Sequence, residues 1–170
     1  MSTFGSGPFD SDTAEDFLDQ LKVQPTTQRL AVVERTLRAG IETGGSTSPS
    51  VLPEEVIVAA AVVAANLSAG RSLPWNEEQP GITEWLAKPV EPALASSAVE
   101  ALEATLPPDG WWWRSWVHTE DKAEAQEAID RLQAVLTGDN HPLHRRDPSP
   151  NARPRATRVP DATGNGGEPR

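Results

Sequence analysis

The chain has 170 residues, no cysteine and a formal net charge of −10 at pH 7. Its length accommodates one domain with a buried core, together with an additional segment at one end. Because cysteine is absent, the chain cannot form disulfides, carry a catalytic thiol or bind zinc through thiolates.

Hydropathy and charge limit the kinds of partner. The longest apolar run, from Val56 to Ala65, is shorter than the about 20 residues that a membrane-spanning helix needs. The N-terminus lacks the basic and apolar regions of a signal peptide, so we expect a soluble, cytoplasmic protein that does not bind membranes. Residues 1–137 carry 21 acidic and 9 basic side chains. This negative body repels phosphate backbones, which disfavours binding of nucleic acid by residues 1–137.

The first notable stretch is residues 4–17, FGSGPFDSDTAEDF, which places acidic side chains between glycines and phenylalanines. Carboxylate oxygens are preferred ligands of calcium and magnesium, so Asp10, Asp12 and Asp16 are candidate ligands of a divalent metal. An EF-hand loop that began at Asp10 would need glycine at its sixth position and glutamate at its twelfth. The sequence has Glu15 and Leu21 there, so any metal site would be of another type.

A structural interpretation explains more of the same stretch. Asp12 and Glu15 have the spacing of a capping box, which predicts a helix over residues 13–22 with Asp12 as its N-cap. This cap does not require Asp10, whose role stays open. The other residues expected to act structurally are aromatic anchors and glycines that permit unusual backbone angles: Phe4, Phe9, Phe17, Gly5 and Gly7.

The run from Ser2 to Phe17 resembles the N-terminal signature of the DUF4259 family. Members of this family of small bacterial proteins typically begin Gly-Thr-Trp-Gly-x-Gly-x-Phe-Asp-Asn-Asp-x-Ala-x-Asp-Phe. Here Ser2 replaces the first glycine, Phe4 the tryptophan and Ser11 the asparagine. The resemblance extends, as a pattern, to about residue 137. It implies a helical domain of uncharacterised function and provides no catalytic residue.

Apolar spacing predicts the next two helices. Residues 27–42 carry one apolar stripe at helical spacing, formed by Leu30, Val33, Leu37 and Ile41. A third helix opens at Pro53, since proline is favoured in the first helical turn. Its sequence, VIVAAAVVAANL, is apolar on nearly every side, which is typical of a buried helix. We therefore expect this alanine-rich helix at the centre of the fold.

Three further helices are predicted between proline and glycine breaks. A short helix is expected in ITEWLAK, residues 82–88, and a longer one over residues 93–106 with Leu94, Ala98 and Leu102 on one face. A final helix over residues 120–137 should bury Ala125, Ile129, Leu132 and Leu136. Strand-like alternation is absent. The expected fold is an all-α, irregular or orthogonal bundle of five to six helices.

The second notable stretch is DGWWWRSW, which contains four of the six tryptophans. Consecutive helical residues are rotated by about 100°, so the three adjacent rings cannot all point inward. We expect Trp111 or Trp112 to be partly exposed while the other rings fill the core. Tryptophan and arginine are enriched at binding hot spots, so Trp111, Trp112 and Arg114 are candidate contacts for a protein partner.

Residues 138–170 are rich in proline, glycine and arginine and poor in large apolar side chains. Such a segment cannot bury enough surface to offset its ordering entropy, so we expect a disordered tail after a helical domain at 1–137. His141 and His144 have spacing that would allow metal binding on a helix, but they lie in this tail. No cofactor is expected.

Two functional hypotheses follow. The first is a non-enzymatic, acidic interaction domain that binds an unidentified, basic protein, with an immunity-type or antitoxin-like role. The second is a metal-dependent hydrolase-like site built on Asp10, Asp12 and Asp16. The absence of a nucleophile arrangement or a phosphate-binding glycine loop favours the first, and neither hypothesis specifies an oligomeric state.

Overall fold

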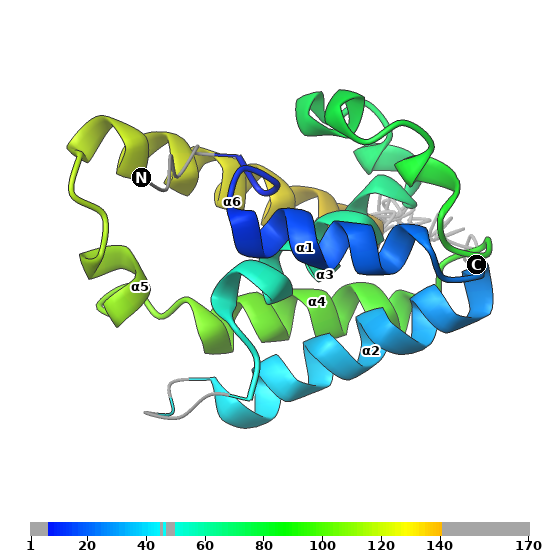
Figure 1. The fold of residues 1–170 in the computed structure, drawn as a ribbon, viewed down its shortest axis with the longest axis horizontal. Coiled ribbons are helices and arrows are strands. Elements are labelled where there is room, and N and C mark those ends of the chain that lie inside the picture. The colour runs from blue at the N-terminus through cyan, green and yellow to red at the C-terminus, as the bar shows by residue number, and fades with distance from the viewer. Residues whose placement is uncertain (1–6, 45, 47–49, 141–170) are drawn as a thin grey trace, which may run out of the picture.

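The computed structural model describes residues 7–44, 46 and 50–140, and within these residues the fold is entirely helical. Figure 1 shows an irregular bundle in which α5 and the start of α6 extend to one side. The α-helices are α1 (Asp12–Lys22), α2 (Thr26–Thr43), α3 (Pro53–Ala65), α4 (Pro92–Thr105), α5 (Trp111–Arg114) and α6 (Thr119–Asn140). Three short 3-10 helices, η1 (Ser68–Gly70), η2 (Pro74–Glu78) and η3 (Ile82–Glu84), connect α3 to α4. The predicted all-α fold is confirmed.

The alanine-rich helix α3 is the centre of the bundle, as its sequence predicts. It packs against α1, α2, α4 and α6, and all of its residues from Val56 to Ala65 are buried. The small alanine side chains let neighbouring helices approach closely, while the valines and Ile57 supply most of the buried volume. Pro53 occupies the first turn, and Glu55 Oε2 accepts a hydrogen bond of 2.8 Å from the backbone N–H of Leu52.

The apolar stripes of the outer helices face α3. In α2, Val33 and Leu37 are fully buried, whereas Leu30 and Ile41 at the ends of the predicted stripe are only partly buried. The predicted inward residues of α4 and α6 are all buried: Leu94, Ala98, Leu102, Ala125, Ile129, Leu132 and Leu136. The last helix continues to Asn140, three residues beyond the predicted domain end at 137. The tail predicted to be disordered lies, from residue 141, outside the described residues.

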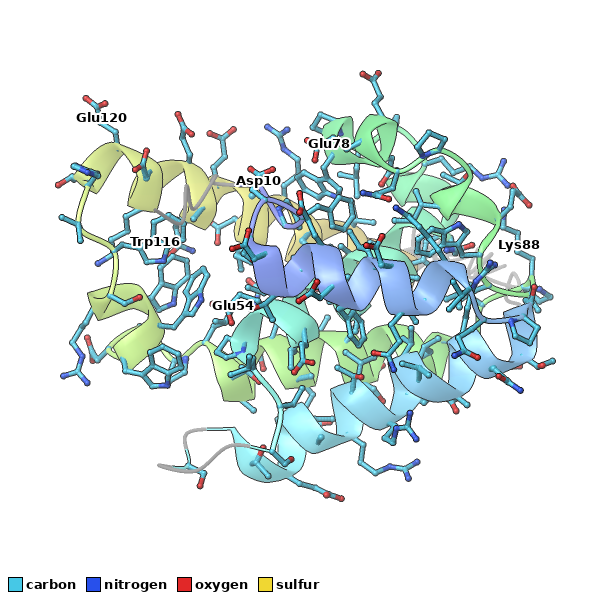
Figure 2. All side chains as sticks on the ribbon, in the orientation of Figure 1. Asp10, Glu54, Glu78, Lys88, Trp116 and Glu120 are labelled. Carbon is cyan, nitrogen blue, oxygen red and sulfur yellow. The ribbon has the colours of Figure 1, made fainter. Side chains whose placement is uncertain are left out.

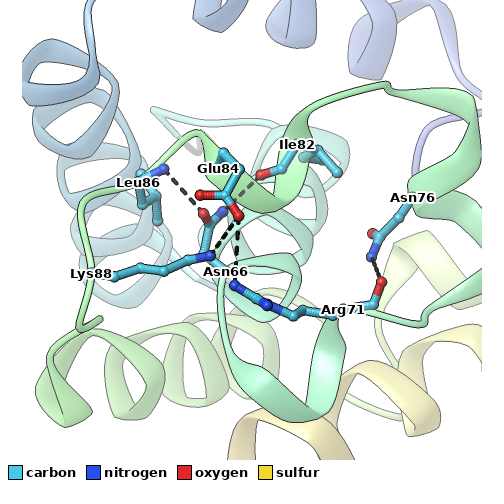
Figure 3. A network of polar contacts seen from close by, with 7 residues as sticks. All are labelled: Asn66, Arg71, Asn76, Ile82, Glu84, Leu86 and Lys88. Atoms are coloured by element: carbon cyan, nitrogen blue, oxygen red, sulfur yellow. Dashed lines mark hydrogen bonds and ion pairs between the residues drawn. The ribbon is translucent and has the colours of Figure 1, made fainter.

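The helix predicted over residues 82–88 is wrong, because only the 3-10 turn η3 forms there. The side chain of Asn66 forms hydrogen bonds with two backbone groups that would bond to each other in a helix (Figure 3). Asn66 Nδ2 donates to the carbonyl of Ile82 at 2.9 Å, and the N–H of Leu86 donates to Asn66 Oδ1 at 3.1 Å. A buried polar side chain that has to be satisfied therefore directs this segment into a loop.

Two further polar contacts hold the same connection. Asn76, which is also buried, donates through Nδ2 to the carbonyl of Gly70 at 2.9 Å. Lys88 Nζ lies 2.9 Å from Glu84 Oε1, and the hydrogen bond from this lysine lowers the pKa of Glu84 (Figure 3). Of the helices that the structure describes, none has both the length and the apolar character needed to cross a membrane.

Candidate functional site

Asp10 closes the turn that precedes α1. Its carboxylate Oδ2 accepts a hydrogen bond of 2.7 Å from the N–H of Gly7, and its own N–H donates to the carbonyl of Gly7 at 3.4 Å. A Cβ atom at position 7 would lie 2.8 Å from Asp10 Oδ2, so a larger residue there would force this carboxylate to shift. Phe9 within the turn is buried, as expected of an anchor, whereas Phe4 and Gly5 lie outside the described residues. Asp10 therefore has a structural role that the capping argument did not provide.

The predicted N-cap of α1 is wrong by one residue. Ser11 is the cap: its backbone is extended, and its Oγ accepts a hydrogen bond of 3.1 Å from the N–H of Ala14. Asp12 is the first helical residue and is exposed. Because the turn closed by Asp10 ends immediately before Ser11, the serine hydroxyl occupies the capping position. Asp12 and Glu15 then act as first-turn acids that complement the helix dipole rather than as a capping box.

The three aspartates proposed as metal ligands do not converge. Asp12 and Asp16 are exposed on α1, while Asp10 is bonded to Gly7. Among the residues that the structure describes, no group of three or more histidine, cysteine, aspartate or glutamate side chains has an arrangement that could hold a metal ion. The N-terminal carboxylates are thus separate surface and turn groups.

A second acid approaches Asp10 from a distant part of the sequence. Glu78, at the end of η2, has its pKa raised by partial burial and by the negative charge of Asp10. Figure 2 labels both carboxylates near the start of α1. The fold thus places these two like charges close enough to interact, which the linear sequence does not indicate.

The tryptophan stretch forms a short helix whose rings have different environments. Trp112 and Trp113 are 7% and 4% exposed, and their rings meet edge to face at 4.6 Å between centroids. Trp112 Nε1 donates to Glu54 Oε1 at 3.3 Å, and Trp113 Nε1 donates to the carbonyl of Leu106 at 3.4 Å. Trp116, labelled in Figure 2, packs edge to face on Trp112 at 5.3 Å. Trp112 is therefore part of the core and is not accessible as a partner contact.

Trp111 is the accessible ring of the stretch, with 51% of its surface exposed. It borders a shallow hollow at the ends of α2 and α4 and the start of α3, lined otherwise by Thr43, Gly44, Ser46, Val51, Pro53 and Thr105. Leu52, between two lining residues, is 45% exposed. We call Trp111, Leu52 and this hollow the Trp111 surface. Arg114, the other proposed contact, is exposed on α5.

Sequence reasoning missed Arg29, which is not one of the residues of the predicted apolar stripe of α2. Arg29 Nε donates to the carbonyl of Leu21 at 2.9 Å and Nη2 donates to the carbonyl of Lys22 at 3.1 Å. Its guanidinium lies 5.3 Å from the ring centroid of Trp85. Arg29 thus donates hydrogen bonds to carbonyl groups at the C-terminal end of α1 and connects this end to the η3 loop. The position of Arg29 at the start of α2, shortly after α1 ends, was the only available sequence signal.

Residues 2–128 match the family described as "Domain of unknown function (DUF4259)". No significant match was found among curated proteins, and none was found among solved structures. The matched region includes the Asp10 turn, the buried helix α3, the tryptophan helix α5 and the first part of α6. The match covers most of the chain and agrees with its N-terminal signature, so the chain belongs to the DUF4259 family.

Proposed function

We propose that this domain is a non-enzymatic interaction module that binds a basic protein, in an immunity-type or antitoxin-like role. The observation that supports this proposal is the outward display of acidic side chains. Asp12, Glu15 and Asp16 are exposed on α1, and none forms an ion pair with a basic side chain of the described residues. Surfaces of this kind accelerate association with a partner of opposite charge and select against partners of like charge.

Two features of the acidic stretch argue against the hydrolase alternative as the better account. The carboxylate of Asp10 is engaged by the N–H of Gly7, and Asp12 and Asp16 extend into solvent from α1. A catalytic carboxylate pair would need the two groups to face one substrate position. The interaction role needs the carboxylates of Asp12 and Asp16 to face solvent, as they do in the structure.

The test is affinity capture with the full chain immobilised and an extract of the source cells applied at low and at moderate salt. We expect a basic protein to be retained at low salt, to be weakened at moderate salt and to bind the purified chain directly. The matched bait carries Asp12→Asn, Glu15→Gln and Asp16→Asn, and should retain less of the same protein. Recovery of no specific protein at either salt, or of an acidic protein whose binding ignores salt, would overturn the proposal.

A further inference from the structure

We propose that the Trp111 surface is the anchoring site for the basic partner, and that it takes a cationic peptide segment carrying one apolar side chain. This inference rests on the proposed function and specifies where and how the partner is recognised. The partner's apolar side chain packs on Trp111 and Leu52, and its lysines or arginines face the carboxylates that surround them.

The backbone that carries the apolar part of this surface is held by local hydrogen bonds. Leu52 is the N-cap of α3, and its N–H is bonded to Glu55. Trp111 opens α5, and its carbonyl accepts a hydrogen bond of 2.9 Å from the N–H of Ser115. The buried Trp112 and Trp113 fix the rest of this short helix. A tryptophan side chain has only two rotatable χ angles and so loses little conformational entropy on binding, which is typical of hot-spot residues.

The charged side chains near the Trp111 surface are mostly acidic, and Arg114, exposed at the other end of α5, is the basic exception. The residues of this surface belong to segments 42–44, 50–55 and 103–113, together with Ser46. Neither lysine nor arginine occurs in them, and their acidic residues are Glu42, Glu54, Glu55, Glu103 and Asp109. Glu42, Glu103 and Asp109 are exposed, and Glu54 and Glu55 are half-buried. An apolar centre with a negative surround is complementary to an apolar side chain flanked by cations.

The same charge distribution argues against a second copy of this chain as the occupant. In a symmetric dimer built on the Trp111 surface, the surrounding carboxylates of one copy would face the same carboxylates of the other. Like charges opposed in this way are destabilising. A polypeptide of positive charge avoids this repulsion, and it supplies the apolar contact as well.

The first experiment measures binding of a synthetic peptide of lysines and arginines with one central leucine, by calorimetry at low salt. Replacing Trp111→Ser together with Leu52→Ser should weaken binding about tenfold or more, the usual effect of losing a hot spot. The matched control is Val23→Ser with Val117→Ser, because these two valines are highly exposed elsewhere. The control pair should leave the affinity unchanged, and a peptide with serine in place of its leucine should bind the unmodified chain as weakly as the double variant does.

The second experiment tests whether acidic side chains near the Trp111 surface affect binding more than acidic side chains elsewhere on the chain. Glu42→Gln with Glu103→Gln should slow peptide association and reduce its salt dependence, whereas Glu34→Gln with Glu91→Gln, two exposed acids elsewhere on the chain, should have a clearly smaller effect. Thermal melting of each variant checks that the fold is retained. Equal losses from both apolar pairs, or from both charge pairs, would overturn the Trp111 surface as the anchor. So would a failure of the unmodified chain to bind the peptide.

The two proposals fail in different ways. If the immobilised chain and its Trp111→Ser variant capture the same basic protein equally well, the Trp111 surface is wrong and the interaction role stands. If no basic protein is captured, the interaction role itself is wrong. A dimer detected by ultracentrifugation and abolished by Trp111→Ser would make a second copy the occupant and overturn the inference.

Discussion

The two unusual stretches of this chain, residues 7–17 and 111–116, differ in where their side chains find partners. In the first, polar groups that resemble a reactive cluster are used within the local turn: Asp10 bonds Gly7 and Ser11 bonds Ala14. In the second, aromatic side chains typical of a core divide, with Trp112 and Trp113 buried and Trp111 left on the surface. In the stretch that suggested chemistry, Asp10 and Ser11 have structural roles, and the tryptophan stretch leaves Trp111 half exposed.

The contrast has a physical origin. A short polar side chain next to a chain reversal finds its nearest partners in its own backbone, so its hydrogen bonds are satisfied locally. A large ring has no such local partner and is buried only if the fold brings apolar surface to it. Composition alone therefore does not show whether clustered aspartates converge or which of several clustered tryptophans is buried.

The largest expected effect is the loss of stability when a buried ring is removed from either stretch. Phe17→Ala in α1 and Trp113→Ala in α5 should each lower the free energy of unfolding by about 3–5 kcal/mol, because both side chains are buried and leave cavities. Urea denaturation measures the change. Trp111→Ala, at half-exposed Trp111, is the matched control and should cost much less; a comparable loss would mean that Trp111 is a core residue.

The next effect concerns Asp10. Asp10→Ala should destabilise the fold by about 1.5 kcal/mol, since it removes the carboxylate that accepts the hydrogen bond from Gly7. Asp10→Asn retains an acceptor oxygen and should be nearly neutral. Thermal unfolding of both variants, with and without added magnesium or calcium, is the measurement. A large loss in Asp10→Asn together with stabilisation of the unmodified chain by metal would restore a metal role for this stretch.

A smaller effect separates the observed cap from the predicted one. Ser11→Ala should cost about 1 kcal/mol because it leaves the N–H of Ala14 without its capping acceptor. Asp12→Ala removes only an exposed first-turn acid and should cost less than about 0.5 kcal/mol. Chemical denaturation under identical conditions compares the two. The reverse ranking would return the cap to Asp12.

The exposed ring can be examined with little change in stability. Trp111→Phe should alter the free energy of unfolding by about 0.5 kcal/mol or less. It should also remove much of the tryptophan fluorescence that acrylamide quenches readily, because Trp75, Trp85, Trp112 and Trp113 are buried. Quenching by acrylamide before and after the substitution is the measurement. Unchanged quenching would place Trp111 in the interior and remove the contrast between the two stretches.

The smallest effect is electrostatic and concerns the contact between Glu78 and Asp10. The pKa of Glu78 is raised in the folded protein by partial burial and by Asp10. The folded state therefore holds this proton more tightly than the unfolded state, so the contribution of Glu78 to stability is greatest below its ordinary pKa. That contribution falls as pH rises through the raised pKa.

Glu78→Gln should consequently raise the melting temperature slightly at pH 7 and leave it nearly unchanged near pH 3.5, where the carboxyl is already protonated. Melting curves of both proteins at the two pH values test this sign. The matched variant is Glu77→Gln at the neighbouring position, which is exposed as Glu78 is and should show a smaller pH-dependent difference. A lowered melting temperature for Glu78→Gln at pH 7 would contradict the contact.

Local pattern was sufficient for most of the helical fold. The all-apolar run of α3 predicted a central buried helix, and the spacing of Ala125, Ile129, Leu132 and Leu136 predicted the inward face of α6. These predictions succeed because helical periodicity and burial are properties of neighbouring residues along the chain. The acidic character of the surface also followed from composition, and it underlies the proposed partner.

Tertiary structure decided what depends on partners distant in sequence. Asn66 bonds Ile82 and Leu86 and prevents a helix there, and Arg29 connects the end of α1 to Trp85. The exposure of Trp111 depends on where α2 and α4 end and where α3 begins beside it. No local propensity encodes these contacts, because each requires two segments to be packed before its hydrogen bond or ring contact exists. The sequence thus determined most of the helices and their charge, and packing decided which tryptophan ring remains exposed.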